Sequence, residues 1–376
     1  MIPALLWLIE RLARRHEVRV FSLYHFERPR TFELLGARVQ DLGLLGRKSI
    51  PGMGLWNAGH LLRRALAAAG PLDVLHAFWA ETPGFLAVRA GHRLAIPVVV
   101  SLAGGELVAF PREGYGSART WKGRFLVRQT LASAHRVTAA SGPMVRLAER
   151  SGVRAELVPL GVPTEFFASP MREEGPPWRL LHVADLNPAK DQDTLLRALE
   201  RIVAAEPATH LDIVGRDTLG GRIQRSCADR GLSGHVTFHG FRPGCELPAF
   251  YSRAHILVHS SLHEAGPLVA LEAAAAGLPT VGTDVGQIAD WAPERAVAVP
   301  VGDDASLADA VLALLRDPAR RLDIGEIARS WAREHDADET ARRFEEIYSE
   351  LAGARPRRGA DSPLQAAARQ PNRSRQ

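Results

Sequence analysis

Two kinds of segment alternate along the chain: short runs rich in Val, Ile and Leu, and longer stretches with helical periodicity. Short continuous apolar runs are typical of strands that are buried on both faces of a sheet. Helical segments between such strands predict right-handed βαβ units and parallel sheets. The predicted strands are Val18–Tyr24, Val74–Phe78, Val98–Leu102, Arg136–Ala140, Glu156–Leu160, Arg179–Ala184, His210–Val214, His235–His239, His255–His259, Thr280–Thr283 and Ala296–Pro300.

A proline-rich and charged stretch, residues 169–178 (SPMREEGPPW), is typical of a linker and divides the body into two halves. We expect residues 1–168 and 179–335 to form two doubly wound domains. Such sheets bind ligands at the carboxyl ends of their strands, so the site should lie in the cleft between them. Residues 336–352 are expected to form a helix that packs back on the first domain, and the basic tail 353–376 is expected to be disordered.

The start of the chain departs from this pattern. It opens on the predicted helix Ala4–Arg15, where a doubly wound sheet would begin with a strand and a glycine-rich turn. The missing strand would be central, and each backbone group left buried and unpaired would cost about 1–3 kcal/mol. We therefore expect that Met1 is not the natural beginning of the functional domain, and that the first strand of the sheet is absent.

Composition and charge exclude several classes of protein. No apolar run approaches the roughly 18 residues that a membrane-spanning helix needs, and the apolar stretch Ile2–Ile9 lacks the flanks of a signal peptide. Cys227 and Cys245 have no metal-binding spacing, and we expect reduced thiols in a cytoplasmic protein. The tail 353–376 accounts for the whole net charge of +5, so the folded body has no basic footprint for nucleic acid.

The clearest chemical pattern lies between Ser260 and Gly286. Pro267 at the expected first helical position and Gly277 just past the end predict a helix at about Pro267–Ala276. The free N–H groups at its N-terminus form an anion site, and Gly266 lets a phosphate approach the backbone closely.

Two carboxylates flank this helix start. Glu264 precedes the helix, and Glu272 lies five residues after Pro267, about 7.5 Å along the axis. Ionised carboxylates accept hydrogen bonds strongly from paired hydroxyls but repel bare phosphate. The pattern favours a nucleoside diphosphate that carries a sugar. The alternative is two surface glutamates at an ordinary helix start.

This segment resembles the E-x7-E signature of the family 4 retaining glycosyltransferases, which have the GT-B architecture. The matching positions are Glu264, Ala265, Gly266, Pro267, Leu268, Leu271, Glu272, Ala273, Gly277 and Pro279. Further segments resemble the family in the same order along the chain: His182–Leu196, Leu211–Gly215, Val236–Gly240 and Thr283–Asp290.

The resemblance implies an α/β fold of two Rossmann-like domains and the transfer of a sugar with retention of anomeric configuration. It implies that Glu264 and Lys190 act in catalysis. Donor contacts are expected at Gly215, Arg216, Gly266, Pro267, Leu268 and Glu272. A UDP- or GDP-sugar would be a substrate, with no cofactor and no metal.

Some positions depart from the family. Asp185 occupies the place of a phosphate-binding arginine, and Arg216 is the candidate to replace that arginine. Ala103 occupies the place of a histidine beside the donor sugar. On this acceptor side we expect His76, Gly104, Gly105 and Glu106 to contribute.

These departures leave a rival function open, a non-catalytic GT-B protein that binds nucleotide sugars or acts as a partner subunit. A Rossmann oxidoreductase would need G-x-G-x-x-G after a strand, and the sequence has none at a suitable place. The acceptor is expected to be a hydroxyl-bearing glycan, lipid or small molecule. Basic and aromatic residues in 112–128 could contact the inner face of a membrane, although a solvated surface is the alternative.

Overall fold

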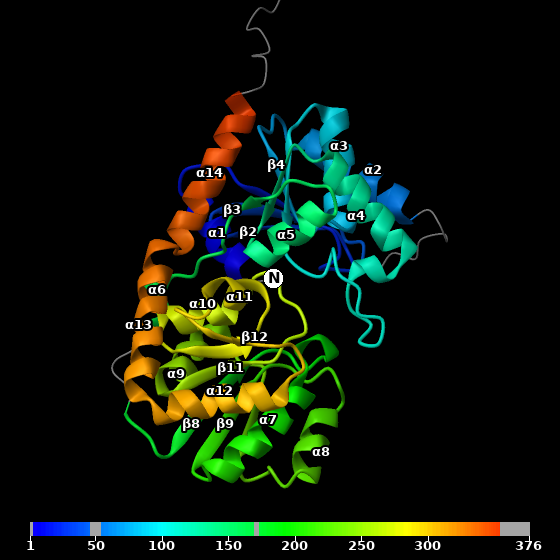
Figure 1. Cartoon of the computed structure of the whole chain (residues 1–376). Helices are drawn as coiled ribbons and strands as arrows, with labels where there is room; N and C mark the ends of the chain where they lie inside the picture. The colour runs from blue at the N-terminus through cyan, green and yellow to red at the C-terminus, as the bar shows by residue number, and fades with distance from the viewer. Residues whose placement is uncertain (1–2, 46–53, 169–172, 354–376) are drawn as a thin grey trace, which may run out of the picture.

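The structure is a computed structural model that describes residues 3–45, 54–168 and 173–353. Residues 169–172 of the expected linker and the tail beyond Gly353 lie outside the described residues. Within the described ranges, no helix is long and apolar enough to cross a membrane. We call the elements from α1 to β7 the N-terminal domain and those from β8 to α13 the C-terminal domain (Figure 1).

The C-terminal domain is built on one parallel sheet in the order β10-β9-β8-β11-β12-β13. Each strand falls within two residues of a predicted apolar run, because continuous Val, Ile and Leu side chains are buried on both faces. The strands are β8 (Trp178–Val183), β9 (Thr209–Val214), β10 (Val236–Gly240), β11 (Ile256–His259), β12 (Thr280–Thr283) and β13 (Val297–Val299).

Helices cover both faces of this sheet (Figure 1). One face is packed by the cluster around Leu196, and the other by the cluster around Leu271. The helices are α7 (Gln192–Ala205), α8 (Arg222–Asp229), α9 (Leu247–Arg253), α10 (Leu268–Ala275), α11 (Gly286–Trp291), α12 (Asp304–Arg316) and α13 (Pro318–Glu334). This is the doubly wound arrangement that the sequence predicts.

The N-terminal domain contains two sheets rather than the single sheet that we expected. A parallel sheet has the order β4-β5-β6-β7, and a separate sheet has the order β1-β3-β2. Among the described residues no strand joins β1 to β4, at the place where we expected a central strand to be absent. The strands are β1 (Arg19–Ser22), β2 (Arg30–Leu34), β3 (Ala37–Asp41), β4 (Leu75–Phe78), β5 (Val98–Leu102), β6 (Arg136–Ala139) and β7 (Glu156–Leu157).

The antiparallel pair β2–β3 is absent from the prediction. Its two-residue turn places Leu35 and Gly36 at φ values of 52° and 80°. Both positions of such a turn favour Asn or Gly, so Leu35 gives no sequence indication of a hairpin. The helices of this part of the chain are α1 (Pro3–Ala13), α2 (Gly54–Ala68), α3 (Thr82–Leu94), α4 (Trp121–Ser133), α5 (Gly142–Arg150) and α6 (Thr164–Phe167).

The last helices connect the two domains. α13 packs against α10, and α14 (Ala337–Gly353) continues upward along α1 of the N-terminal domain (Figure 1). Phe344 and Ile347 of α14 are buried with Leu8 of α1 in one apolar cluster. The hydroxyl of Thr340 also accepts a hydrogen bond from the N–H of Gly161 at 2.7 Å. α14 therefore packs against one side of the N-terminal domain.

Candidate functional site

The candidate site is centred on the N-terminus of α10, where the chain leaves β11. Pro267 has φ −73° and ψ 101°, so it precedes the helix and is not its first residue as the sequence suggested. Gly277 follows the helix with φ +62°, in the left-handed conformation that ends many helices. α10 is buried almost throughout, which explains its run of Ala and Leu.

Glu264 lies in the loop before α10 and accepts several hydrogen bonds at one oxygen. Its Oε1 accepts from Nζ of Lys190, from the Ser261 hydroxyl at 2.7 Å and from Nε2 of His259 at 3.1 Å. Burial by itself raises the pKa of Glu264, but the Lys190 ammonium and the His259 hydrogen bond outweigh it, and the pKa lies well below its usual range. Glu264 is therefore an ionised carboxylate at neutral pH, and Lys190 is its counter-ion.

The position of Lys190 is fixed by the backbone around it. It ends the short 3-10 helix η2 (Pro188–Lys190) after β8, and the N–H of Leu262 donates to Ala189 O at 2.9 Å. The Ser260 hydroxyl donates to the carbonyl of Lys190 at 2.7 Å. The turn after β8 and the loop after β11 are thus joined, because these strands are neighbours in the sheet. Two segments far apart in sequence bring Lys190 to Glu264.

Glu272 lies inside α10 and is 3% exposed. The hydroxyl of Tyr251, on α9, donates to its Oε2 at 2.6 Å. Burial raises the pKa of Glu272 to about 7, and the Tyr251 hydrogen bond opposes that rise. Glu264 and Glu272, which the sequence paired by spacing, therefore differ in their electrostatics. Glu264 is held ionised, whereas the pKa of Glu272 lies near neutral pH.

Gly215 and Arg216 stand at the end of β9. A Cβ at Gly215 would lie 1.9 Å from Ala184 O, so the glycine allows the ends of β8 and β9 to meet. Asp185 accepts a hydrogen bond from the Arg216 N–H at 2.8 Å and pairs with its guanidinium at 3.4 Å. The guanidinium also lies 5.5 Å from the ring centroid of Phe241. Asp185 stands where the resemblance implies a phosphate-binding arginine. It thus holds Arg216 at the same edge of the sheet.

On the N-terminal side, the loop after β5 contains Gly104, Gly105 and Glu106. Glu106 is 1% exposed, and its two oxygens accept hydrogen bonds from the N–H groups of Ala103 (3.0 Å) and Gly104 (2.8 Å). Burial raises the pKa of Glu106. Its carboxyl group is buried and accepts hydrogen bonds from the backbone of its own loop. The sequence had suggested that it could meet acceptor hydroxyls.

His76 also has internal partners. Hydrogen bonds join its Nδ1 to the Tyr348 hydroxyl at 2.6 Å and its Nε2 to the Ser101 hydroxyl at 2.7 Å. Burial lowers the pKa of His76 to about 3, so the ring is neutral. The imidazole joins β4 and β5 to α14, and both of its nitrogens are occupied.

Contacts between the two domains bring the predicted Gly104 together with residues that the sequence did not single out. His263, next to Glu264, forms a hydrogen bond with Gly104 O at 3.2 Å. Tyr115 lies 6.3 Å from the His263 ring, and burial together with the charge of Glu264 raises the pKa of Tyr115 to about 12. Asp290 accepts from the N–H of Gly142 at 2.7 Å. These residues come together only through domain packing, so spacing along the chain could not identify them.

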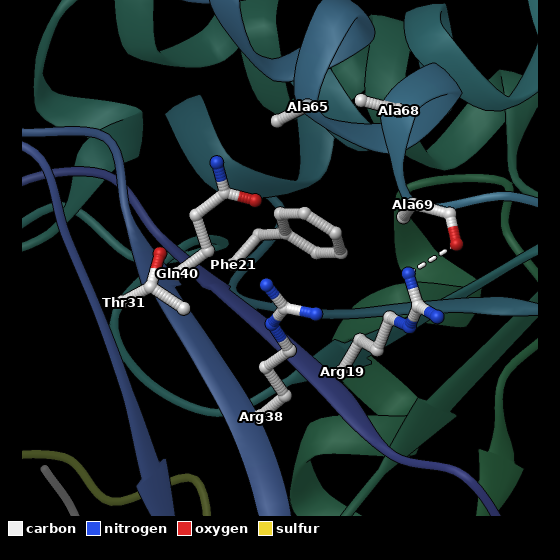
Figure 2. A pocket seen from close by; sticks show the side chains of 8 residues that line it. All are labelled: Arg19, Phe21, Thr31, Arg38, Gln40, Ala65, Ala68 and Ala69. Atoms are coloured by element: carbon white, nitrogen blue, oxygen red, sulfur yellow. Dashed lines mark hydrogen bonds between the residues drawn. The ribbon is translucent and has the colours of Figure 1, made fainter.

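A cavity of about 210 Å³ lies elsewhere, between the β1-β3-β2 sheet and the end of α2 (Figure 2). Its lining includes Arg19, Arg38 and Gln40, and the Arg19 guanidinium donates to Ala69 O. It contains none of the residues predicted for the site. Over the described ranges, no group of three or more His, Cys, Asp or Glu residues is arranged to hold a metal ion.

Comparisons with known proteins point to one kind of chemistry. Residues 1–163 match the "Glycosyl transferase 4-like domain" model, and residues 164–331 match "Glycosyl transferases group 1". A D-inositol 3-phosphate glycosyltransferase of Salinispora arenicola is 28% identical over 345 residues, covering 83% of this chain and 77% of the relative. A GDP-mannose-dependent alpha-(1-6)-phosphatidylinositol monomannoside mannosyltransferase of Mycolicibacterium smegmatis is 32% identical over 219 residues, covering 52% of this chain and 54% of the relative.

Solved structures show the same fold. Sucrose-phosphate synthase of Thermosynechococcus elongatus superposes with a TM-score of 0.77 at 23% identity, covering 93% of this chain and 92% of the other. HepE of Anabaena, in complex with UDP-glucose, superposes with a TM-score of 0.71 at 17% identity, covering 92% and 95%. The two domains therefore have the arrangement found in those structures.

Proposed function

This chain belongs to the family 4 glycosyltransferases of GT-B architecture, and we propose that it transfers a sugar from a UDP- or GDP-sugar to a hydroxyl acceptor with retention of anomeric configuration. The observation that carries this proposal is the pairing of Lys190 with an ionised Glu264 at the N-terminus of α10, with Glu272 buried farther along the same helix. An anion site between two carboxylates suits a diphosphate with a sugar on one side and a ribose on the other.

The donor diphosphate would lie at the start of α10. The N–H groups of Gly266 and Leu268 and the positive end of the helix dipole favour negative charge there. A Cβ at Gly266 would lie 2.8 Å from the Cβ of Ala140 in the N-terminal domain. The glycine therefore lets the loop before α10 pack closely against the N-terminal domain. Pro267 supplies no N–H and instead sets the direction of the chain into the helix.

The carboxylates and the lysine would contact different parts of the donor. Glu264 would accept hydrogen bonds from hydroxyls of the transferred sugar through Oε2, since Oε1 already has three partners. The Lys190 ammonium would shift part of its interaction to the leaving diphosphate and stabilise the charge that develops on it. Glu272 would accept from ribose hydroxyls, and Arg216, held by Asp185, would supply a second cation for the diphosphate.

Retention is explained by attack on the same face from which the diphosphate departs. The bond between the anomeric carbon and the acceptor oxygen forms as the bond to the phosphate oxygen breaks. The acceptor proton passes to that phosphate oxygen, so no protein nucleophile is needed. Ala103, in place of a family histidine, is compatible with this route. The acceptor would approach from the loop that carries Gly104 and Gly105.

The test is turnover by the purified chain. A thermal-shift screen of nucleotide sugars identifies the donor, because a bound ligand raises stability by mass action. Nucleotide release and the anomeric configuration of the product are then measured for the wild type, for Glu264→Gln, and for Glu294→Gln as a matched change at an exposed glutamate of the same domain.

We expect Glu264→Gln to lose turnover and Glu294→Gln to keep it. Inversion in the product would refute the retaining mechanism. A donor that binds but is neither hydrolysed nor transferred would instead favour the non-catalytic alternative.

A further inference from the structure

One face of α4 exposes two large aromatic side chains. Trp121 is 76% exposed and Phe125 is 52% exposed. They lie four residues apart, so they are neighbours on the same side of the helix. Leu126, Val127 and Leu131 are buried on the opposite side. Trp121 and Phe125 therefore do not contribute to the packing of α4 in the domain. They form an apolar patch that is exposed to solvent.

Basic residues surround this patch. Lys122, Arg124 and Arg128 are exposed on α4, and Arg119 is exposed just before it. The sequence 121–133 contains no Asp or Glu. Among the described residues none of these four side chains forms an ion pair, whereas many other arginines of the chain do. The patch is thus positively charged without internal compensation, although the folded body as a whole is balanced.

The loop that precedes this patch in sequence lies at the boundary between the two domains. α4 directly follows the loop that carries Gly104 and Tyr115, and this loop contacts His263 next to Glu264. The Gly123 N–H donates a hydrogen bond to the Thr120 hydroxyl. Thr120 thereby caps the N-terminus of α4 at the end of that loop. Figure 1 shows α4 and this loop on the same side of the upper domain, with the loop turned toward the lower one. A surface that docks on α4 would therefore lie close to the acceptor side of the site.

We propose that Trp121, Phe125 and the basic residues around them dock on an anionic lipid bilayer, and that the acceptor is a hydroxyl group carried by a lipid of that bilayer. Aromatic side chains enter the interface while Lys and Arg remain at the level of the headgroups. The identification of the acceptor rests on the proposed glycosyl transfer, whereas the docking does not. Charge complementarity selects the bilayer over an apolar protein partner, because every charged side chain on α4 has the same sign.

The first experiment measures co-sedimentation of the full chain with vesicles of phosphatidylcholine alone or mixed with phosphatidylglycerol. We expect binding to the mixed vesicles only, and binding should fall as salt is raised. Trp121→Ser/Phe125→Ser should lower partitioning about tenfold or more, because the apolar contact is lost. Lys122→Glu/Arg128→Glu should lower it by at least about fivefold for each basic residue removed.

Matched controls separate this face from general effects. Trp56→Ser removes a tryptophan of α2 that is 67% exposed, and Arg225→Glu/Arg333→Glu reverses two exposed charges of the C-terminal domain. Both controls should bind vesicles as the wild type does. Equal binding to neutral and mixed vesicles, wild-type binding by the α4 variants, or no binding by the wild type would each overturn the docking surface. A self-association that the α4 variants abolish would show that a second copy covers it.

The second experiment tests the acceptor. Nucleotide release without vesicles and sugar transfer to lipid in vesicles are compared for the wild type and Trp121→Ser/Phe125→Ser. We expect the variant to keep the release rate and to lose transfer to lipid. If the wild type releases no nucleotide, the proposed function fails while the vesicle result still stands. If transfer to a water-soluble acceptor exceeds transfer to lipid, the lipid acceptor is refuted.

Discussion

The buried carboxyl group of Glu272 makes the stability of the chain depend on pH in a predictable direction. Its pKa is raised from an ordinary value of 4.5 to about 7. A carboxyl group with a raised pKa in the folded state contributes stability at low pH and loses it as pH rises through that pKa. At about 1.4 kcal/mol for each pKa unit, the ionised group costs the fold about 3 kcal/mol at alkaline pH.

Glu272→Gln removes this cost and keeps an oxygen that can accept from the Tyr251 hydroxyl. The stability of the variant relative to wild type should therefore grow by about 2 kcal/mol from about pH 5.5 to about pH 8.5. The assay is urea unfolding of both proteins across that range, with Glu294→Gln to show the effect of removing an exposed charge. A difference that stays constant with pH would refute the reasoning.

The same substitution should weaken binding of nucleotides. The ionised carboxylate is the stronger acceptor for ribose hydroxyls, so wild-type affinity should rise with pH through about 7. Calorimetric titration with the donor nucleotide and with inorganic pyrophosphate tests this, since pyrophosphate lacks the ribose. An affinity for nucleotide that Glu272→Gln leaves unchanged would place the ribose elsewhere.

Three further outcomes are expected. Lys190→Gln should lower kcat about 10²–10³-fold, as measured by nucleotide release, because the leaving diphosphate loses its ammonium; an unchanged kcat would contradict that role. Arg216→Ala should raise the donor KM but change the unfolding free energy by less than about 1 kcal/mol, since its ion pair is exposed. His76→Phe should lower the unfolding free energy by about 1–3 kcal/mol, because the Tyr348 and Ser101 hydroxyls lose a partner. It should leave the acceptor KM unchanged, and a shift in that KM alone would assign His76 to the substrate.

Local patterns in the sequence determined the parallel strands, the helices between them and their order, but not the antiparallel pair β2–β3. The continuous apolar runs predicted the strands because strands in a parallel sheet are buried on both faces. Pro267 and Gly277 located α10 to within a residue, since their backbone preferences act at the position where they occur. The sequence also predicted a missing first strand in the N-terminal domain, and among the described residues β1 and β4 belong to separate sheets. The roles of Glu264, Lys190 and Glu272 in donor binding remain predictions.

Only the tertiary structure decided which side chains are in contact and how buried, charged and hydrogen-bonded each one is. Glu264 and Glu272 look alike in sequence, yet one pairs with a lysine 74 residues away and the other is buried against Tyr251. Glu106 and His76 appeared available for an acceptor, but packing supplies partners for their polar atoms from the backbone and from α14. Burial, charge and hydrogen-bonding partners depend on contacts between distant segments. They therefore become defined only when the sheets and domains are assembled.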